Sequence, residues 1–182
     1  FALCDVRLAE ELKLAAAQSD DIAERLQVSG VEVIAGTGRL DRTGGVVVTS
    51  EAGERYVPAD GVLIATGAHP RVIEAAQPDG ERIFTWEQIY ALQEVPEHMI
   101  VVGSGVTGAE FASAYNGLGC QVTLVSSRDR VLPGEDPDAA TLIEDVFTRR
   151  GMTVLNKSRM ASVRRTSDGV EVTLDDGRIV EG

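Results

Sequence analysis

The chain has 182 residues, of which 43% are hydrophobic, so it is long and apolar enough for one ordinary domain or parts of two. Its formal net charge of −12, with no long basic stripe, argues against nucleic acid and anionic membrane surfaces as partners. The sequence has no run of about 18 apolar residues and no signal-peptide pattern, which predicts no membrane span and a cytoplasmic location.

The first part of the chain predicts a helix and then a β-meander. Apolar or small residues recur at three- and four-residue spacing from Leu8 to Leu26, which favours a helix over residues 5–29 that Gly30 ends. The strand-like segment VLIAT at 62–66 is wholly apolar and is expected to be buried. Before it, strands are expected at 31–35, 46–49 and 55–57, with a Gly-Thr-Gly turn at 36–38.

The second part predicts strands that alternate with helices. Thr85 and Gln88 form a capping box for a helix over 86–94. Asp136 as N-cap and Pro137 at the first helical position mark the beginning of a later helix. Strands are expected at 99–103, 121–125 and 152–155, and further helices at 106–118 and 137–150. This β-α-β-α-β order is typical of a parallel, doubly wound sheet, so the predicted fold class is α/β.

Two segments of the chain resemble each other. Residues 40–67 and 163–182 share the order strand, Thr/Gly turn, V-x-V-T strand, acidic-Gly-Arg turn and short strand. In the first copy a buried strand and an Ala-Thr-Gly follow almost at once, whereas the second copy stops where that strand is expected. We therefore expect a piece of a longer protein, divided near the polar stretch QPDGER into residues 1–82 and 83–182.

Three glycines separate the strand expected at 99–103 from the helix that follows it. Gly103, Gly105 and Gly108 fit G-x-G-x-x-G, in which the first makes a tight turn, the second admits a pyrophosphate and the third permits close helix–strand packing. The N–H groups at the beginning of the helix favour a bound anion. This context predicts a dinucleotide site, and close packing alone is the alternative.

The end of the next strand bears on which dinucleotide fits. An Asp or Glu there would bind the ribose diol of NAD or FAD and repel a 2′-phosphate, but this chain has Ser126, Ser127 and Arg128. Hydroxyls bond either a ribose hydroxyl or a phosphate, and Arg128 adds a positive charge. We predict that both NADH and NADPH are used. The alternative for Arg128 is a solvated turn residue.

Several other titratable side chains can be interpreted either as structural residues or as functional ones. Glu110 suits the first turn of a helix, or alternatively it faces the nicotinamide or a lysine near a second cofactor and is a catalytic candidate. Cys4 and Cys120 are too far apart for a CxxC pair and are expected to be unreactive thiols in a reducing compartment. His69 and His98 have no carboxylate or cysteine partner nearby in sequence and are expected to be solvated or structural, so no metal site is predicted.

Three stretches carry a resemblance to a known family. VLIATGAHPRV, TWEQIYALQEVPEHMIVVGSGVTGAEFA and GCQVTLVSSRDRVLP stand in the order and at the distances found in the pyridine nucleotide-disulfide oxidoreductases. The chain is most similar to their dihydrolipoamide-dehydrogenase-like NAD(P)H:quinone reductases. The resemblance implies Rossmann-like FAD- and NAD(P)-binding domains, each with a parallel sheet, helices and a three-stranded antiparallel β-meander, and both incomplete here. Residues 1–82 would be the later part of the FAD domain, and 83–182 the NAD(P) domain without its last strand.

The resemblance also implies roles for particular residues. The adenine of FAD would contact the backbone at Thr37 and Gly38. The pyrophosphate of FAD would pass Ala65, Thr66 and Gly67. NAD(P)H would be cradled by Gly103, Ser104, Gly105, Val106, Thr107 and Gly108, with Ser126, Ser127 and Arg128 at its adenosine ribose. Met160 would pack on the adenine, or alternatively is a core residue. The lipoamide dehydrogenases that prefer NAD have a glutamate where Ser126 stands. The redox-active C-x-x-x-x-C and the catalytic His-Glu pair of the family would lie outside residues 1–182.

Together these features predict an FAD-dependent NAD(P)H oxidoreductase in which hydride passes from nicotinamide to flavin and then to an acceptor. The resemblance favours a quinone acceptor and a homodimeric parent protein. Dihydrolipoamide dehydrogenase is the alternative enzyme, and a non-catalytic dinucleotide-binding module or redox sensor is the alternative of another class. The chain alone is expected to be inactive and to lack bound FAD.

Overall fold

The structure is a computed structural model that describes residues 2–182, with side chains from residue 13 onward. Its parts form two compact units, one made by Glu10–His69 and the other principally by Pro70–Gly182. Cys4 lies outside the residues whose side chains are described. The domain boundary expected after residue 82 stays a prediction.

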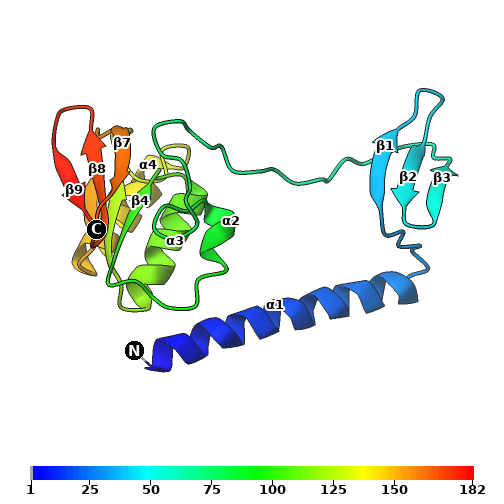
Figure 1. Cartoon of the computed structure of the whole chain (residues 1–182), viewed down its shortest axis with the longest axis horizontal. Coiled ribbons are helices and arrows are strands. Elements are labelled where there is room, and N and C mark those ends of the chain that lie inside the picture. The colour runs from blue at the N-terminus through cyan, green and yellow to red at the C-terminus, as the bar shows by residue number, and fades with distance from the viewer. Residues whose placement is uncertain (1) are drawn as a thin grey trace. The chain divides into compact units, whose positions relative to one another are not determined.

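The first unit contains most of a long helix and a small antiparallel sheet (Figure 1). Helix α1 spans Ala2–Val28, which confirms the predicted helix, and Gly30 follows it with a φ of +74° that favours glycine. Strands β1 (Thr37–Leu40), β2 (Val46–Ser50) and β3 (Gly53–Val57) form the sheet in the order β1-β2-β3. The antiparallel β-meander expected from the sequence is therefore present.

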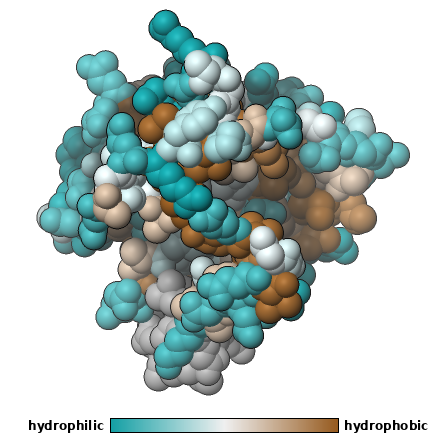
Figure 2. Space-filling view, turned by 90° about the vertical axis from the view of Figure 1, so that its right-hand side faces the viewer, coloured by the Kyte–Doolittle hydropathy of each residue, from teal (hydrophilic) through white to brown (hydrophobic). Residues whose placement is uncertain are grey.

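Three predictions in this unit are wrong. The Gly-Thr-Gly stretch is not a turn, because Thr37 and Gly38 lie on β1 opposite Thr49 and Val48. Residues 31–35 and 62–66 are not strands, and Leu63 is 91% exposed. A strand needs a neighbour for its N–H and C=O groups, and none of the described residues pairs with these two segments. Val33 and Ile64 in these segments are exposed as well. Figure 2 shows apolar residues among polar ones on one face of the molecule.

A parallel sheet flanked by helices forms the centre of the second unit. Strands β4 (His98–Val102), β5 (Gln121–Val125) and β6 (Thr153–Leu155) pair in that order, and all pairs are parallel. Helix α3 (Val106–Gly117) packs on β4 and β5, and α4 (Pro137–Arg149) packs on β6. These elements agree with the sequence prediction within one or two residues.

The helix predicted over 86–94 is shorter than expected. Helix α2 spans Trp86–Ile89, and its capping box is present, with the Thr85 N–H donating to Gln88 Oε1 at 2.8 Å. The chain then tightens, because the N–H groups of Ala91 and Leu92 donate to carbonyls three residues earlier. The residue before Pro96 is also restrained from helical geometry, so the turn is not extended.

A second antiparallel sheet covers the other side of the parallel sheet. Strands β7 (Met160–Arg165), β8 (Val170–Leu174) and β9 (Ile179–Glu181) form it, which confirms the strands expected from the internal resemblance. One buried cluster joins α3 and α4 to β5 through Ala112, Val122, Leu124 and Phe147, and another joins Val125 to Val172 and Leu174. The parallel sheet thus lies between helices and β7–β9 (Figure 1).

The polar stretch before α2 is held by one carboxylate. Asp79 Oδ1 accepts hydrogen bonds from the N–H groups of Arg82, Ile83 and Glu81 at 2.8, 2.9 and 2.9 Å. These bonds lower the pKa of Asp79 to about 2. Because this pKa is lower than that of an aspartate in the unfolded chain, ionised Asp79 stabilises the folded state at pH values above the usual aspartate pKa. This stabilisation is lost as the pH falls towards 2.

Replacing Asp136 by alanine is expected to lower the free energy of unfolding by about 1 kcal/mol. Asp136 Oδ1 accepts from the N–H groups of Asp138 and Ala139 at 3.0 and 3.1 Å, so its loss leaves two donors at the beginning of α4 without their cap. Urea unfolding measures the change, with Asp136→Asn as the control that keeps a capping side chain. Equal stability of the two variants would contradict this role.

Candidate functional site

The loop between β4 and α3 is built on glycine. Gly103 has a φ of +116°, and its N–H donates to the Val125 carbonyl at 2.9 Å. A Cβ atom on Gly108 would stand 2.9 Å from the Gly103 carbonyl carbon and overlap its oxygen. The first turn of α3 therefore packs directly on the loop, and both positions require glycine for different physical reasons.

The beginning of α3 is open. Gly105 is the N-cap, no side chain of the described residues caps this end, and a Cβ added to Gly105 would meet nothing within 4 Å. The first intrahelical donor is the Ala109 N–H, so the preceding N–H groups of Val106, Thr107 and Gly108 have no partner within the helix. Val106 and Thr107 are exposed. An anion could therefore take these donors, whereas Asp136 occupies the same place in α4.

Ser126 is buried at the end of β5, where a ribose contact is predicted. It is fully buried, and its hydroxyl lies 2.6 Å from the hydroxyl of Ser104, which is also buried. The Arg128 N–H donates to the Ser126 hydroxyl at 3.1 Å. Ser126 thus ties the glycine loop to the loop after β5, and Ser127, Arg128 and Asp129 are exposed after the end of this strand. Because Ser126 has no exposed surface, the predicted ribose contact would require its hydroxyl to become accessible, and this contact stays a prediction.

The loop after β6 joins the same network, which sequence reasoning missed. The Ser158 N–H donates to the Ser126 carbonyl at 2.8 Å, and the Lys157 N–H donates to the Arg128 carbonyl at 2.7 Å. These bonds link segments about thirty residues apart. The position of Lys157 just after a predicted strand was the only sequence signal, because the carboxyl ends of parallel strands meet at one edge.

The remaining predicted residues lie in different surroundings. Glu110 is exposed on α3, but it is the fifth residue of the helix and lies beyond its first turn, so the first-turn interpretation is wrong. Its catalytic role stays a prediction. Met160 is half-buried and packs against the cluster of Val125, Val172 and Leu174, as its core alternative expects. Thr37 and Gly38 lie on β1, while Ala65, Thr66 and Gly67 lie in an exposed segment in which Gly67 has a φ of +75°.

In the second unit, the side chains of Cys120 and His98 make contacts within the protein. Cys120 is buried, and this burial raises the pKa of its thiol to about 11, so the thiol is protonated at neutral pH. His98 Nε2 lies 2.9 Å from Thr123 Oγ1, and burial lowers the pKa of the imidazole. Among the side chains that the structure describes, from residue 13 onward, no group of three or more His, Cys, Asp or Glu is placed to hold a metal ion.

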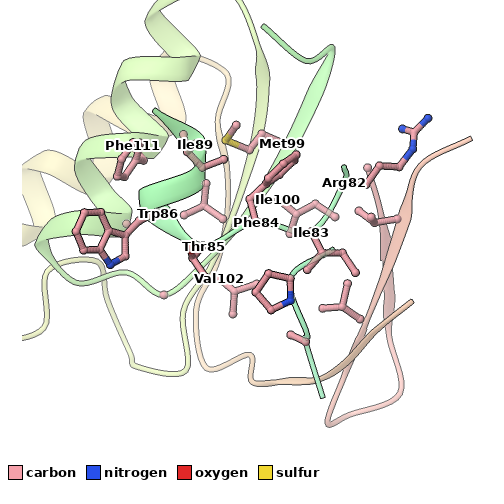
Figure 3. Close-up of a pocket in the computed structure, with 18 of the residues that line it drawn as sticks. Arg82, Ile83, Phe84, Thr85, Trp86, Ile89, Met99, Ile100, Val102 and Phe111 are labelled. Carbon is pink, nitrogen blue, oxygen red and sulfur yellow. The ribbon is translucent and has the colours of Figure 1, made fainter. Parts of the chain in front are cut away.

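A cavity of about 810 Å³ opens beside the glycine loop. Its lining includes Gly103, Gly105 and Thr107 together with apolar side chains from α2, α3 and β4, which Figure 3 shows. Tyr90 joins two of the lining rings, with its ring centroid 6.4 Å from that of Trp86 and 5.3 Å from that of Phe111. This size and composition suit a small organic ligand that has a polar group at the loop.

Comparison with known proteins agrees with this geometry. The family model of the pyridine nucleotide-disulphide oxidoreductases matches residues 5–182. The chain belongs to this family. The proteins of this family are NAD(P)H-dependent flavoprotein oxidoreductases that use FAD.

Similar proteins include both enzyme types expected from the sequence. A Mycobacterium tuberculosis protein named NAD(P)H dehydrogenase (quinone) is 53% identical over 93% of this chain and 36% of its own length. The dihydrolipoyl dehydrogenase of Chlorobaculum tepidum is 37% identical over 90% of this chain and 34% of its own. The crystal structure of LpdA from M. tuberculosis superposes with a TM-score of 0.86 at 52% identity, over 98% of this chain and 40% of that one. The chain thus spans about a third of the length of these curated relatives.

Proposed function

We propose that the chain is the cofactor-binding part of an FAD-dependent NAD(P)H oxidoreductase that passes electrons to a quinone. The observation that carries this proposal is the open beginning of α3, beside a loop in which the positions of Gly103 and Gly108 require glycine. The donors of Val106, Thr107 and Gly108 would hold the pyrophosphate of NAD(P)H, because both unpaired N–H groups and the helix macrodipole favour negative charge. The bound nicotinamide supplies a hydride.

The residues around this loop would orient the cofactor. Ser104 and Ser126 fix the loop against β5 through their 2.6 Å hydroxyl contact, so that the donors need not reorganise when the cofactor binds. Trp86 and Phe111 supply apolar surface beside the loop on which a flat ring can pack. Thr37, Gly38 and the segment 65–67 are the residues that we assign to FAD. Their exposed backbone, with Gly67 at a positive φ, is compatible with a close approach of phosphate.

The quinone acceptor is supported by the name of the M. tuberculosis relative and by its 53% identity. Dihydrolipoyl dehydrogenase is the second candidate, supported by the relative from C. tepidum at 37% identity. None of the helices within residues 2–182 is long and apolar enough to cross a membrane. A cytoplasmic location and a homodimeric parent protein stay predictions.

The test uses the protein at the full length of these relatives, purified with its flavin. Anaerobic addition of NADPH or NADH is expected to bleach the flavin absorbance, and a quinone is expected to restore it. Turnover of dihydrolipoamide with NAD⁺, in place of quinone turnover, would support the second candidate. Dinucleotide binding without flavin reduction would leave only a binding module and would contradict both enzymes.

Replacing Arg128 by alanine is expected to raise the KM for NADPH by about tenfold and that for NADH by less than about twofold. Arg128 is exposed at the end of β5, where a 2′-phosphate but not a ribose hydroxyl would gain a full charge interaction. Steady-state kinetics with both cofactors measures the ratio, and Arg149→Ala on α4 is the control. An unchanged ratio would remove Arg128 from the site.

A further inference from the structure

The loops that follow β5 and β6 form one surface at the carboxyl edge of the parallel sheet. Lys157 and Arg128 meet there through the 2.7 Å bond between the Lys157 N–H and the Arg128 carbonyl. A second bond, from the Ser158 N–H to the Ser126 carbonyl at 2.8 Å, fixes the register of the two loops. Both Lys157 and Arg128 have exposed side chains. Two cationic side chains therefore project from neighbouring points of the backbone.

Lys157 has an uncommon backbone conformation. Its φ is +51°, in the left-handed region that residues other than glycine, asparagine and aspartate seldom adopt. The next residue holds this conformation, because buried Ser158 donates to the Asn156 carbonyl at 3.0 Å and accepts from Arg178 Nη2 at 2.7 Å. The position of Lys157 is thus fixed by the surrounding hydrogen bonds and not by its own preference.

The charges of Lys157 and Arg128 are not neutralised locally. Arg178 has its own partner, Asp176, at 2.7 Å, but neither Lys157 nor Arg128 forms an ion pair with any residue whose side chain the structure describes. The strand end beside them carries the buried hydroxyl of Ser126 in place of a carboxylate. An anion that binds a chain with a net charge of −12 needs local cations, and Lys157 and Arg128 are available at this edge, where Asp129 is the acidic residue next to Arg128 in sequence.

We propose that Lys157 is a specificity-determining residue that, together with Arg128, holds the 2′-phosphate of NADPH. This proposal rests on the proposed function, because a cofactor whose pyrophosphate lies at the β4–α3 loop extends its adenosine across the carboxyl ends of β5 and β6. A phosphate monoester carries a charge of about −2 and three acceptor oxygens, which suits one cation from each loop. NADH lacks the 2′-phosphate, so Lys157 is expected to add no affinity for NADH.

The experiment measures binding of two probes, 2′,5′-ADP and 5′-ADP, to the protein by titration calorimetry. Lys157→Asn removes the charge and keeps a residue that tolerates a left-handed backbone. This substitution is expected to weaken the binding of 2′,5′-ADP by about tenfold and the binding of 5′-ADP by less than about twofold. Lys157→Arg is expected to restore most of the affinity for 2′,5′-ADP. Arg149→Asn, which loses the same charge near the amino end of β6, is expected to change neither probe.

Each outcome decides between the proposals. Unchanged binding of 2′,5′-ADP to Lys157→Asn would overturn the role of Lys157. An equal loss of both probes would also overturn it, because a distorted loop and not the 2′-phosphate would then be the cause. If neither probe binds the unaltered protein, the dinucleotide site itself fails, and the proposed function falls together with this inference.

Discussion

Replacing Gly108 by alanine is expected to lower the free energy of unfolding by about 3 kcal/mol and to abolish cofactor binding. The added Cβ would overlap the carbonyl oxygen of Gly103 and stand 2.9 Å from its carbonyl carbon. These are backbone atoms, and Gly103 is itself held by the bond from its N–H to Val125. No side-chain rotation can relieve the overlap, so α3 must move away from β4 and from the cluster that contains Ala112.

Gly117→Ala on the same helix is the matched control for this change. Nothing lies within 4 Å of a Cβ atom at Gly117, and its φ is not positive, so alanine is expected to leave stability unchanged or to raise it by about 0.5 kcal/mol. Urea unfolding of the two variants gives the comparison. Similar midpoints for Gly108→Ala and Gly117→Ala would show that α3 does not pack on the loop as described.

The elements that sequence analysis predicted correctly are those with strong local signals. Helix α4 has an N-cap, a proline at its first position and an apolar face, and it forms with Asp136 as the cap. Strand β5 has the sequence QVTLV, with three apolar residues and a threonine between a helix and a turn, and four of its five residues are buried. In both cases the information that defines the element lies within about ten residues of it.

The segments at 31–35 and 62–66 show where such reasoning stops. Their residues have the composition of buried strands, yet Val33 is 62% exposed and Leu63 is 91% exposed. Composition indicates that a segment can form a strand, but a strand makes its hydrogen bonds with a neighbouring strand that can lie far away in the sequence. The strand prediction therefore depended on pairing that a local pattern does not contain.

In the candidate site, too, some features follow from a local sequence pattern and others depend on which strands are neighbours. The three glycines and the beginning of α3 follow from a spacing that can be read directly, and Gly103 and Gly108 have the conformation and packing that their motif positions require. The burial of Ser126 and the contact of Lys157 with Arg128 depend on β5 and β6 being adjacent. Neighbouring strands thus decide which of the polar residues after a strand remain exposed.

Replacing Gly105 by aspartate is expected to preserve the fold and to weaken binding of 5′-ADP by at least about 100-fold. Gly105 has a φ of −69° and a ψ of −177°, which any residue adopts, and its Cβ position is unobstructed. An aspartate at this N-cap can accept from the same N–H groups that we assign to the pyrophosphate, as Asp136 does in α4. The helix is then capped by its own chain, and the carboxylate repels the incoming diphosphate.

Gly105→Asn separates the two causes of this loss, because asparagine caps the helix without adding a charge. It is expected to weaken 5′-ADP by about tenfold, less than aspartate does, while both variants unfold at urea concentrations no lower than the unaltered protein. A Gly105→Asp protein that binds 5′-ADP normally would show that the diphosphate does not use the donors of α3. The comparison with α4 gives the reason for the glycine: a helix that must bind an external anion cannot supply its own cap.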